Sequence, residues 1–159
     1  MPIETKNDGP IRIAIDDRAV LQLLSRLLER GADLRPAMRG IAGVLAHDTE
    51  MAFDREASPA GVPWRPLAES TKKARVEKKY PERPILQVTR LLVRSVHTDY
   101  GVDYAMIGSS AVYAAIHQLG GKAGRKQQVT IPARPYLGLS PAGQEEILAT
   151  LSRYLTAQR

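Results

Sequence analysis

A helical pattern over residues 36–56 constrains the fold of this chain more than any other feature of its sequence. Apolar residues recur there at three- and four-residue spacing and would line one face of a helix: Met38, Ala42, Leu45, Ala46, Ala52 and Phe53. Ile41, Val44 and Met51 lie off that stripe. A helix that is apolar on more than one side either runs through the centre of the core or is covered by another subunit.

The residues before this helix predict a strand and a first helix. Ile11, Ile13 and Ile15 alternate with other residues, which is the two-residue period of a strand with one buried face. Asp16 or Asp17 can then cap a helix that ends at Gly31 and carries a strong apolar stripe: Val20, Leu23, Leu24, Leu27 and Leu28. Asp33 offers a second cap, with Pro36 in the first turn of the long helix.

Residues 58–84 predict a loop followed by a basic segment. Three prolines and a glycine fall within residues 58–66, which excludes a helix there. The only tryptophan of the chain, Trp64, lies in this loop. It can either plug the loop onto the core or stack on a ligand, and the structural role is the favoured one. Residues 67–79 can form a short basic helix before Pro81 and Pro84.

The second half of the chain predicts short elements and a final helix. Residues 86–94 indicate a turn of helix, 95–100 and 103–108 a hairpin around Gly101, 113–119 a helix, and 127–131 a strand. The last helix begins at Ser140-Pro141, with its apolar stripe at Ile147, Leu148, Leu151, Tyr154 and Leu155. We therefore expect a single α+β domain over residues 1–159, in which a small, mostly antiparallel sheet packs against the N-terminal helices and a C-terminal helix follows.

Composition narrows the classes of function. The chain has 159 residues and no cysteine, which excludes disulfides and sulfur-ligated zinc. No apolar run approaches the roughly 18 to 20 residues that span a bilayer, and the first residues do not resemble a signal peptide, so we expect a cytoplasmic protein without a membrane partner.

The net charge of +6 is concentrated in two clusters, the second at a predicted basic hairpin tip over residues 121–127. These clusters are either solvated surface or contacts for DNA or an acidic protein face. Their residues are Lys72, Lys73, Arg75, Lys78 and Lys79, and Lys122, Arg125 and Lys126.

Motifs for catalysis, metals and cofactors are weak. His47, His97 and His117 lie in no metal-binding pattern, and no GxSxG elbow supports a hydrolase built around His117. The glycines and lysines of residues 120–126 lack the spacing of a phosphate-binding loop, so we expect no cofactor. His47-Asp48 is interpreted as a polar strip in mid-helix, and Glu145-Glu146 as negative charge in the first turn of the last helix.

Five segments in the last two thirds of the chain form a recognisable order: SPAGVPWRPL at 58–67, LQVTRLLVRS at 86–95, IGS at 107–109, YAAIHQLGG at 113–121 and IPARPYLGLS at 131–140. In this order they resemble the phage virion morphogenesis family, the tail completion proteins of contractile-tailed phages and related prophages. Arg90 stands where this family usually has glycine, and Leu119 where it usually has phenylalanine.

The resemblance implies a structural protein that completes the tail or joins it to the head without catalysis. It implies a fold similar to tail completion, terminator and neck proteins, and a homo-oligomeric ring, expected to be sixfold. The implied partners are tail tube, terminator or head–tail connector proteins, with DNA passing through the channel. Such a protein would assemble in the host cytoplasm and end in the virion. Nucleic-acid binding by the basic clusters is the alternative.

The residues expected to carry assembly are those of the family motifs. His117 can belong to an internal hydrogen-bond network or contact another subunit. For Arg134, which lies between prolines, we favour a salt bridge to a neighbouring subunit. The full set is Trp64, Tyr113, His117, Gln118, Gly120, Gly121, Arg134, Pro135 and Tyr136.

Overall fold

The computed structural model describes residues 18–29, 31 and 33–157, and over these residues the fold is α+β. The strand expected at residues 11–15 and the caps expected at Asp16 or Asp17 lie outside the described residues. In chain order the elements are α1 (Arg18–Glu29), α2 (Arg35–Arg55), α3 (Glu69–Glu77), α4 (Leu91–Arg94), β1 (Val96–Tyr100), β2 (Ala105–Ser109), α5 (Ala114–Leu119), β3 (Gly121–Ala123), a 3₁₀ turn (Arg125–Gln127), β4 (Val129–Ile131) and α6 (Pro141–Ala157).

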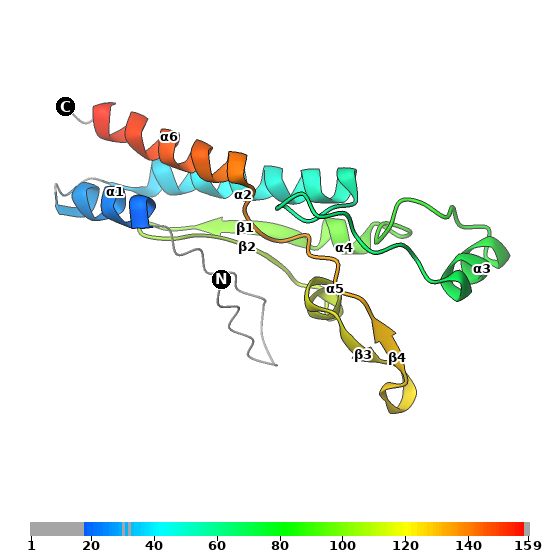
Figure 1. The fold of residues 1–159 in the computed structure, drawn as a ribbon. Coiled ribbons are helices and arrows are strands. Elements are labelled where there is room, and N and C mark those ends of the chain that lie inside the picture. The colour runs from blue at the N-terminus through cyan, green and yellow to red at the C-terminus, as the bar shows by residue number, and fades with distance from the viewer. Residues whose placement is uncertain (1–17, 30, 32, 158–159) are drawn as a thin grey trace.

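Helix α2 lies at the centre of the molecule (Figure 1). It packs against α6 on one side and against both β1 and β2 on another, while α1 packs against α6. Ile41, which lies off the main apolar stripe, is buried together with Met38 and Leu45 for this reason. The first of the two alternatives set by the sequence therefore holds over much of this helix: its second apolar side is covered within the same chain.

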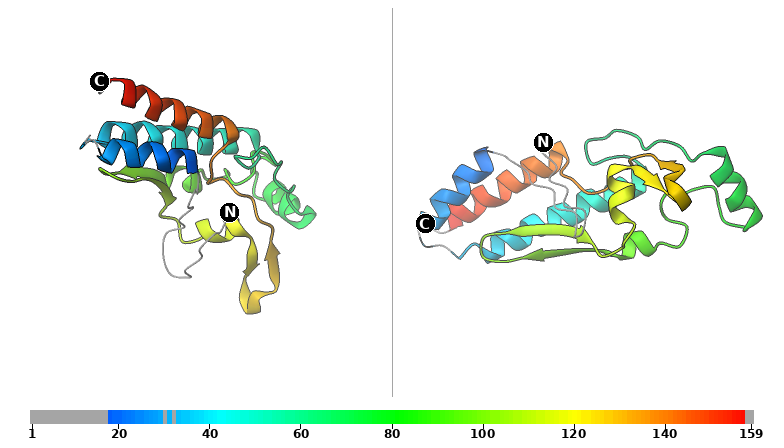
Figure 2. Two further views of the ribbon diagram at one scale, coloured as in Figure 1. Left: turned by 60° about the vertical axis from the view of Figure 1, so that its left-hand side comes forward. Right: turned by 90° about the horizontal axis from the view of Figure 1, so that it is seen from below.

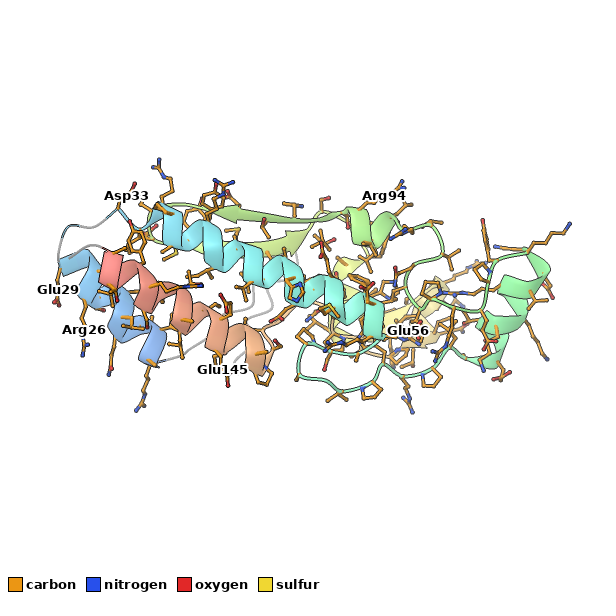
Figure 3. All side chains as sticks on the ribbon, turned by 90° about the horizontal axis from the view of Figure 1, so that it is seen from above. Arg26, Glu29, Asp33, Glu56, Arg94 and Glu145 are labelled. Atoms are coloured by element: carbon orange, nitrogen blue, oxygen red, sulfur yellow. The ribbon has the colours of Figure 1, made fainter. Side chains whose placement is uncertain are left out.

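The ends of α2 are fixed by polar contacts. At its start, the Asp33 carboxylate accepts a hydrogen bond of 3.0 Å from the backbone N–H of Arg35, although the cap position itself is taken by Leu34. At its end, Glu56 adopts a left-handed backbone with φ of 51°. The Glu56 carboxylate then accepts the backbone N–H of Ile85 at 2.6 Å and pairs with Arg83 at 2.9 Å. Figure 3 labels Glu56 at this end of the helix, where the loops converge.

The strands form two separate antiparallel hairpins rather than one sheet. In the first, β1 pairs with β2, and Ala105 and Ile107 pack against the helices. In the second, β3 pairs with β4, with Lys122 opposite Thr130. The two views of Figure 2 show that only the first hairpin lies along the helical layer. The second hairpin and α3 project from the body as two arms.

Asp48 joins α2 to the start of α6, and the interpretation of His47-Asp48 as simply a polar strip in mid-helix is wrong for Asp48. Its carboxylate is buried and accepts hydrogen bonds from the Ser140 backbone N–H at 2.7 Å and the Ser140 hydroxyl at 2.8 Å. The Ser140 hydroxyl in turn accepts the N–H of Gly143 at 2.9 Å and so caps α6. A Cβ at Gly143 would collide with the Asp48 carboxylate, so the two helices approach closely here.

The acidic pair of the last helix lies further along than expected. Because α6 begins at Pro141, Glu145 and Glu146 fall in its second turn, and its first turn carries no acidic residue. Their interpretation as first-turn charges is therefore wrong. Glu146 instead pairs with Arg153 at 2.7 Å on the exposed surface.

Candidate functional site

An aromatic cluster pins the proline-rich loop to the end of α2. The rings of Trp64 and Phe53 meet edge to face with centroids 5.6 Å apart, and Phe53 and Tyr136 lie 5.1 Å apart. The indole N–H of Trp64 donates to the Pro135 carbonyl at 2.8 Å. Trp64 is buried, so its ring is a plug between two loops and offers no open face for ligand stacking.

Gln118 connects α5 to the loop over residues 131–140. Its side-chain oxygen accepts the backbone N–H groups of Tyr136 and Leu137, each at 2.9 Å, and its amide donates to the Leu137 carbonyl at 2.8 Å. The Tyr136 hydroxyl donates to the Ala114 carbonyl at 3.3 Å, and burial raises the pKa of Tyr136 to about 12. The backbone N–H groups of Tyr136 and Leu137, the Leu137 carbonyl and the Tyr136 hydroxyl are thereby all satisfied within one chain.

Arg134, for which the sequence favoured a salt bridge to a neighbouring subunit, is buried and bonded to backbone groups of its own chain. The side chain is only 5% exposed; its Nε donates to the Arg65 carbonyl at 2.8 Å and its Nη2 to the Pro66 carbonyl at 3.0 Å. Burial lowers the pKa of the guanidinium, and the positive charge of Arg75 adds to this. Arg134 therefore fastens the 58–66 loop to the 131–140 loop through backbone carbonyls.

His117 lies beside this network without joining it through its ring. Its ring stacks edge to face with Tyr113 at 5.9 Å, and its backbone carbonyl accepts the Arg134 N–H at 2.7 Å. Nδ1 is buried and has no hydrogen-bond partner among the described residues. Burial lowers the pKa of His117, and the nearby Arg134 charge lowers it further, so the imidazole is neutral at pH 7.

Gly120 and Gly121 let the chain double back from α5 into β3. Gly120 has a φ of 75°, in the region that favours glycine, and a Cβ there would lie 2.8 Å from the backbone nitrogen of Ala133. The chain segments on either side of this point can approach only because Gly120 has no side chain.

Of these residues, Tyr113, His117 and Arg134 line a groove of about 770 Å³ between α3, α5 and β4. Many of its lining residues are aliphatic, including Leu67, Leu86 and Ile131, while Arg65 and Arg75 supply positive charge. None of the described residues that line the groove carries a carboxylate. The groove therefore favours an apolar partner that brings negative charge.

The first basic cluster does not form one free positive face. Lys72 pairs with Glu69 at 2.9 Å and Glu82 at 3.4 Å, and the hydrogen bond to Glu69 is the main cause that raises the pKa of Lys72. Arg75 donates to three backbone carbonyls, those of Pro81, Glu82 and Pro84. Within the described part of the chain, the cations of both clusters that remain exposed without an ion pair are Lys73, Lys78, Lys79, Lys122, Arg125 and Lys126.

Two residues of this architecture, Asp48 and Glu56, were missed as functional positions by sequence reasoning. Asp48 lies three residues after Leu45 and four before Ala52, which places it on the buried face of the helix. This spacing was the sequence signal that could have predicted its burial. Glu56 follows the helix without any such periodic signal. In the portion of the chain that is described, no group of His, Asp and Glu residues could hold a metal ion, and no helix is both long and apolar enough to cross a membrane.

The structure is that of an α+β protein whose motif residues hold the 58–66 and 131–140 loops together, next to the projecting α3 and β3–β4 hairpin. Comparison with known proteins shows that the chain belongs to the phage virion morphogenesis family, whose sequence model matches residues 15–156. It therefore has a structural or assembly role in a phage or prophage.

The relatives agree with this family. The chain is 37% identical over 149 residues to the putative capsid assembly protein G of Escherichia phage Mu, covering 92% of this chain and 95% of that protein. It is 38% identical over 142 residues to the Mu-like prophage FluMu G protein 1 of Haemophilus influenzae, covering 88% and 92% respectively. No solved structure matches the chain.

Proposed function

We propose that this chain completes a phage tail or joins the tail to the head, as one subunit of a homo-oligomeric ring, and catalyses no reaction. The ring is expected to be a hexamer that docks on tail tube, terminator or head–tail connector proteins. It would assemble in the host cytoplasm and remain in the virion. The phage Mu relative is named for capsid assembly. A joining role is compatible with that name and with the family description.

One observation carries the proposal: a buried clamp of motif residues lies next to two projecting arms. The clamp consists of Trp64, Gln118, Arg134 and Tyr136, whose side chains are buried and bonded to backbone groups of their own chain. The arms, α3 and the β3–β4 hairpin, extend from it (Figure 1). A protein that docks needs rigidly placed surfaces, and this division supplies them.

Electron microscopy of particles made without this protein tests the proposal. Normal heads together with tails that lack a finished end, or tails that fail to join heads, would support it, and adding back the wild-type chain should restore complete virions. A deletion that yields complete, infectious particles would refute it. A second add-back uses a chain with Gln118→Leu, which should restore particles poorly because this change loosens the clamp.

A second candidate function is nucleic-acid binding by the tip of the β3–β4 hairpin. The observation that favours it is local: Lys122, Arg125 and Lys126 are exposed and have no ion pair among the described residues. Phosphate contacts release counterions, so affinity for duplex DNA would fall log-linearly with salt. Binding that is unchanged when all three cations are replaced by alanine would contradict this function.

A further inference from the structure

The turn that joins β1 to β2 presents large apolar side chains to solvent. Tyr100, Val102 and Tyr104 are 37%, 51% and 43% exposed. Apolar and aromatic side chains gathered on one exposed turn are typical of a surface that contacts a partner, since tyrosine is enriched at such contacts. We call residues 99–104 the hairpin tip.

The hairpin tip is held in one shape and carries negative charge. The Gly101 N–H donates to the Tyr104 carbonyl at 2.8 Å, and the Tyr104 hydroxyl donates to the Asp99 carboxylate at 3.0 Å. A side chain at Gly101 would collide with the Tyr104 ring, which lies directly against the turn. The Asp103 carboxylate is exposed and makes no hydrogen bond or ion pair among the described residues. A surface that is already ordered in this way loses little conformational entropy on binding.

The groove between α3, α5 and β4 complements this tip. Its aliphatic residues Leu67, Leu86 and Ile131 are only half-buried, so the open groove leaves apolar surface in water. Arg65 also lines the groove and is exposed, and its guanidinium makes no hydrogen bond or ion pair among the described residues. None of the described residues that line the groove carries a carboxylate. The groove and the hairpin tip therefore match in apolar character and are opposite in charge.

The hairpin tip of a chain lies far from the groove of the same chain. Ala105, next to the tip, packs with the core cluster around the first half of α2, whereas Leu92 of the groove belongs to the cluster around Phe53 near the other end. Helix α2 has 21 residues and is therefore about 30 Å long. Figures 1 and 2 show the turn of the β1–β2 hairpin beside the start of α2, and α3 and β4 beyond its other end. Only the tip of a neighbouring copy can enter the groove.

We propose that the groove binds the hairpin tip of a second copy of this chain. The apolar side chains of the tip cover the aliphatic residues of the groove, and Asp103 pairs with Arg65 of the neighbour. Each copy inserts one tip and accepts another, which is a head-to-tail interface of the kind that closes into a ring. The inference rests on the ring of the proposed function and identifies the contact between its subunits.

Disulfide trapping tests this contact, because the chain has no cysteine of its own. Three full-length variants each carry Val102→Cys together with one groove cysteine, Thr71→Cys, Thr89→Cys or Thr130→Cys, at exposed positions that line the groove. The two cysteines of one chain lie too far apart to bond to each other, so oxidation links successive copies. At least one variant should form a ladder of covalent oligomers, in which mass spectrometry finds the tip cysteine joined to the groove cysteine.

A matched control carries Leu21→Cys in place of Val102→Cys. Leu21 is also 51% exposed but lies on α1, away from the tip. Ladders that are clearly stronger with Val102→Cys than with Leu21→Cys support the inference. Equal or absent ladders in all three variants overturn it, and so do ladders in which tip cysteines join only to each other.

Charge reversal gives a second, independent readout, measured as self-association in sedimentation velocity. Arg65→Glu and Asp103→Arg should each weaken self-association on the order of tenfold, because each places like charges in contact, and the chain with both changes should recover most of it. Arg94→Glu, an exposed position of α4 outside the groove, is the control and should have no effect.

The two proposals fail in different ways. If the wild-type chain assembles and binds tails but neither Arg65→Glu nor Asp103→Arg changes assembly, the groove has another occupant and only this inference fails. If the wild-type chain neither assembles nor binds tails, the proposed function fails with it.

Discussion

Replacing Gln118 by leucine should loosen the clamp without changing its shape. The two side chains have similar size, but leucine cannot accept the N–H groups of Tyr136 and Leu137 or donate to the Leu137 carbonyl. Gln118 and both partners are buried, so water does not replace these bonds freely.

The magnitude follows from the groups left without partners. An unsatisfied buried backbone group costs about 1 to 3 kcal/mol, and three such groups, with partial relaxation of the loop, give roughly 3 to 6 kcal/mol. That is a large share of the roughly 5 to 15 kcal/mol by which a domain is stable. At about 2 to 4 °C per kcal/mol for a chain of this size, the melting temperature should fall by roughly 6 to 24 °C.

Urea unfolding followed by circular dichroism measures this loss of free energy. Gln22→Leu is the matched control, because Gln22 is exposed on α1 and its change should cost less than about 0.5 kcal/mol. A Gln118→Leu chain as stable as the Gln22→Leu chain would refute the reasoning, since the buried hydrogen bonds would then contribute nothing.

Three further predictions follow from local geometry. Gly143→Ala should destabilise the chain by about 1 to 3 kcal/mol, because the new Cβ collides with the Asp48 carboxylate. Gly43→Ala has open space around it and should stabilise the chain by about 0.5 to 1 kcal/mol. The melting temperatures of the two variants should therefore move in opposite directions. Arg90→Gly should stabilise by about 0.5 to 1 kcal/mol in urea unfolding, since Arg90 has a φ of 57°, and a decrease would contradict this. Because the pKa of His117 is lowered in the folded chain, the unfolded chain binds the proton first as pH falls. The contribution of neutral His117 to the free energy of unfolding is therefore fully present above about pH 6.5 and is lost as pH falls through the lowered pKa. His117→Phe should flatten the dependence of stability on pH between about pH 7 and 5, and an unchanged slope would count against this reasoning.

The elements of this fold follow from local signals in the sequence. The stripe of α2, the hairpin around Gly101 and the start of α6 after Ser140 are each set by periodicity or by turn and cap residues within a few positions. The buried position of Trp64 could be predicted in the same way, because a tryptophan in a proline-rich loop usually packs its ring onto the core.

The partners of buried polar side chains could not be predicted in this way. Arg134 binds carbonyls of Arg65 and Pro66, almost 70 residues away in sequence, and nothing near Arg134 encodes those partners. Asp48 likewise contacts Ser140, 92 residues further along the chain, through the packing of α2 against α6. Such contacts depend on tertiary packing, which explains why the polar strip was the wrong interpretation of Asp48 and why the buried position of Arg134 could not be predicted.

Arg90 shows how a departure from a family pattern can be read physically. The family usually has glycine there, and the backbone of Arg90 is left-handed at the start of α4. The backbone at this position suits glycine, yet the residue is arginine, with a φ of 57°. A local strain of this kind is a cost of roughly 1 to 2 kcal/mol that the surrounding contacts offset.

The central claim is that this chain is an assembly subunit that closes on copies of itself and docks on a tail. Light scattering of the purified chain, alone and mixed with purified tails, measures it most directly. The account predicts a discrete closed oligomer, expected to be a hexamer, that forms in solution or on the tail and comigrates with it. A chain that stays monomeric at every concentration and never associates with tails would contradict the account.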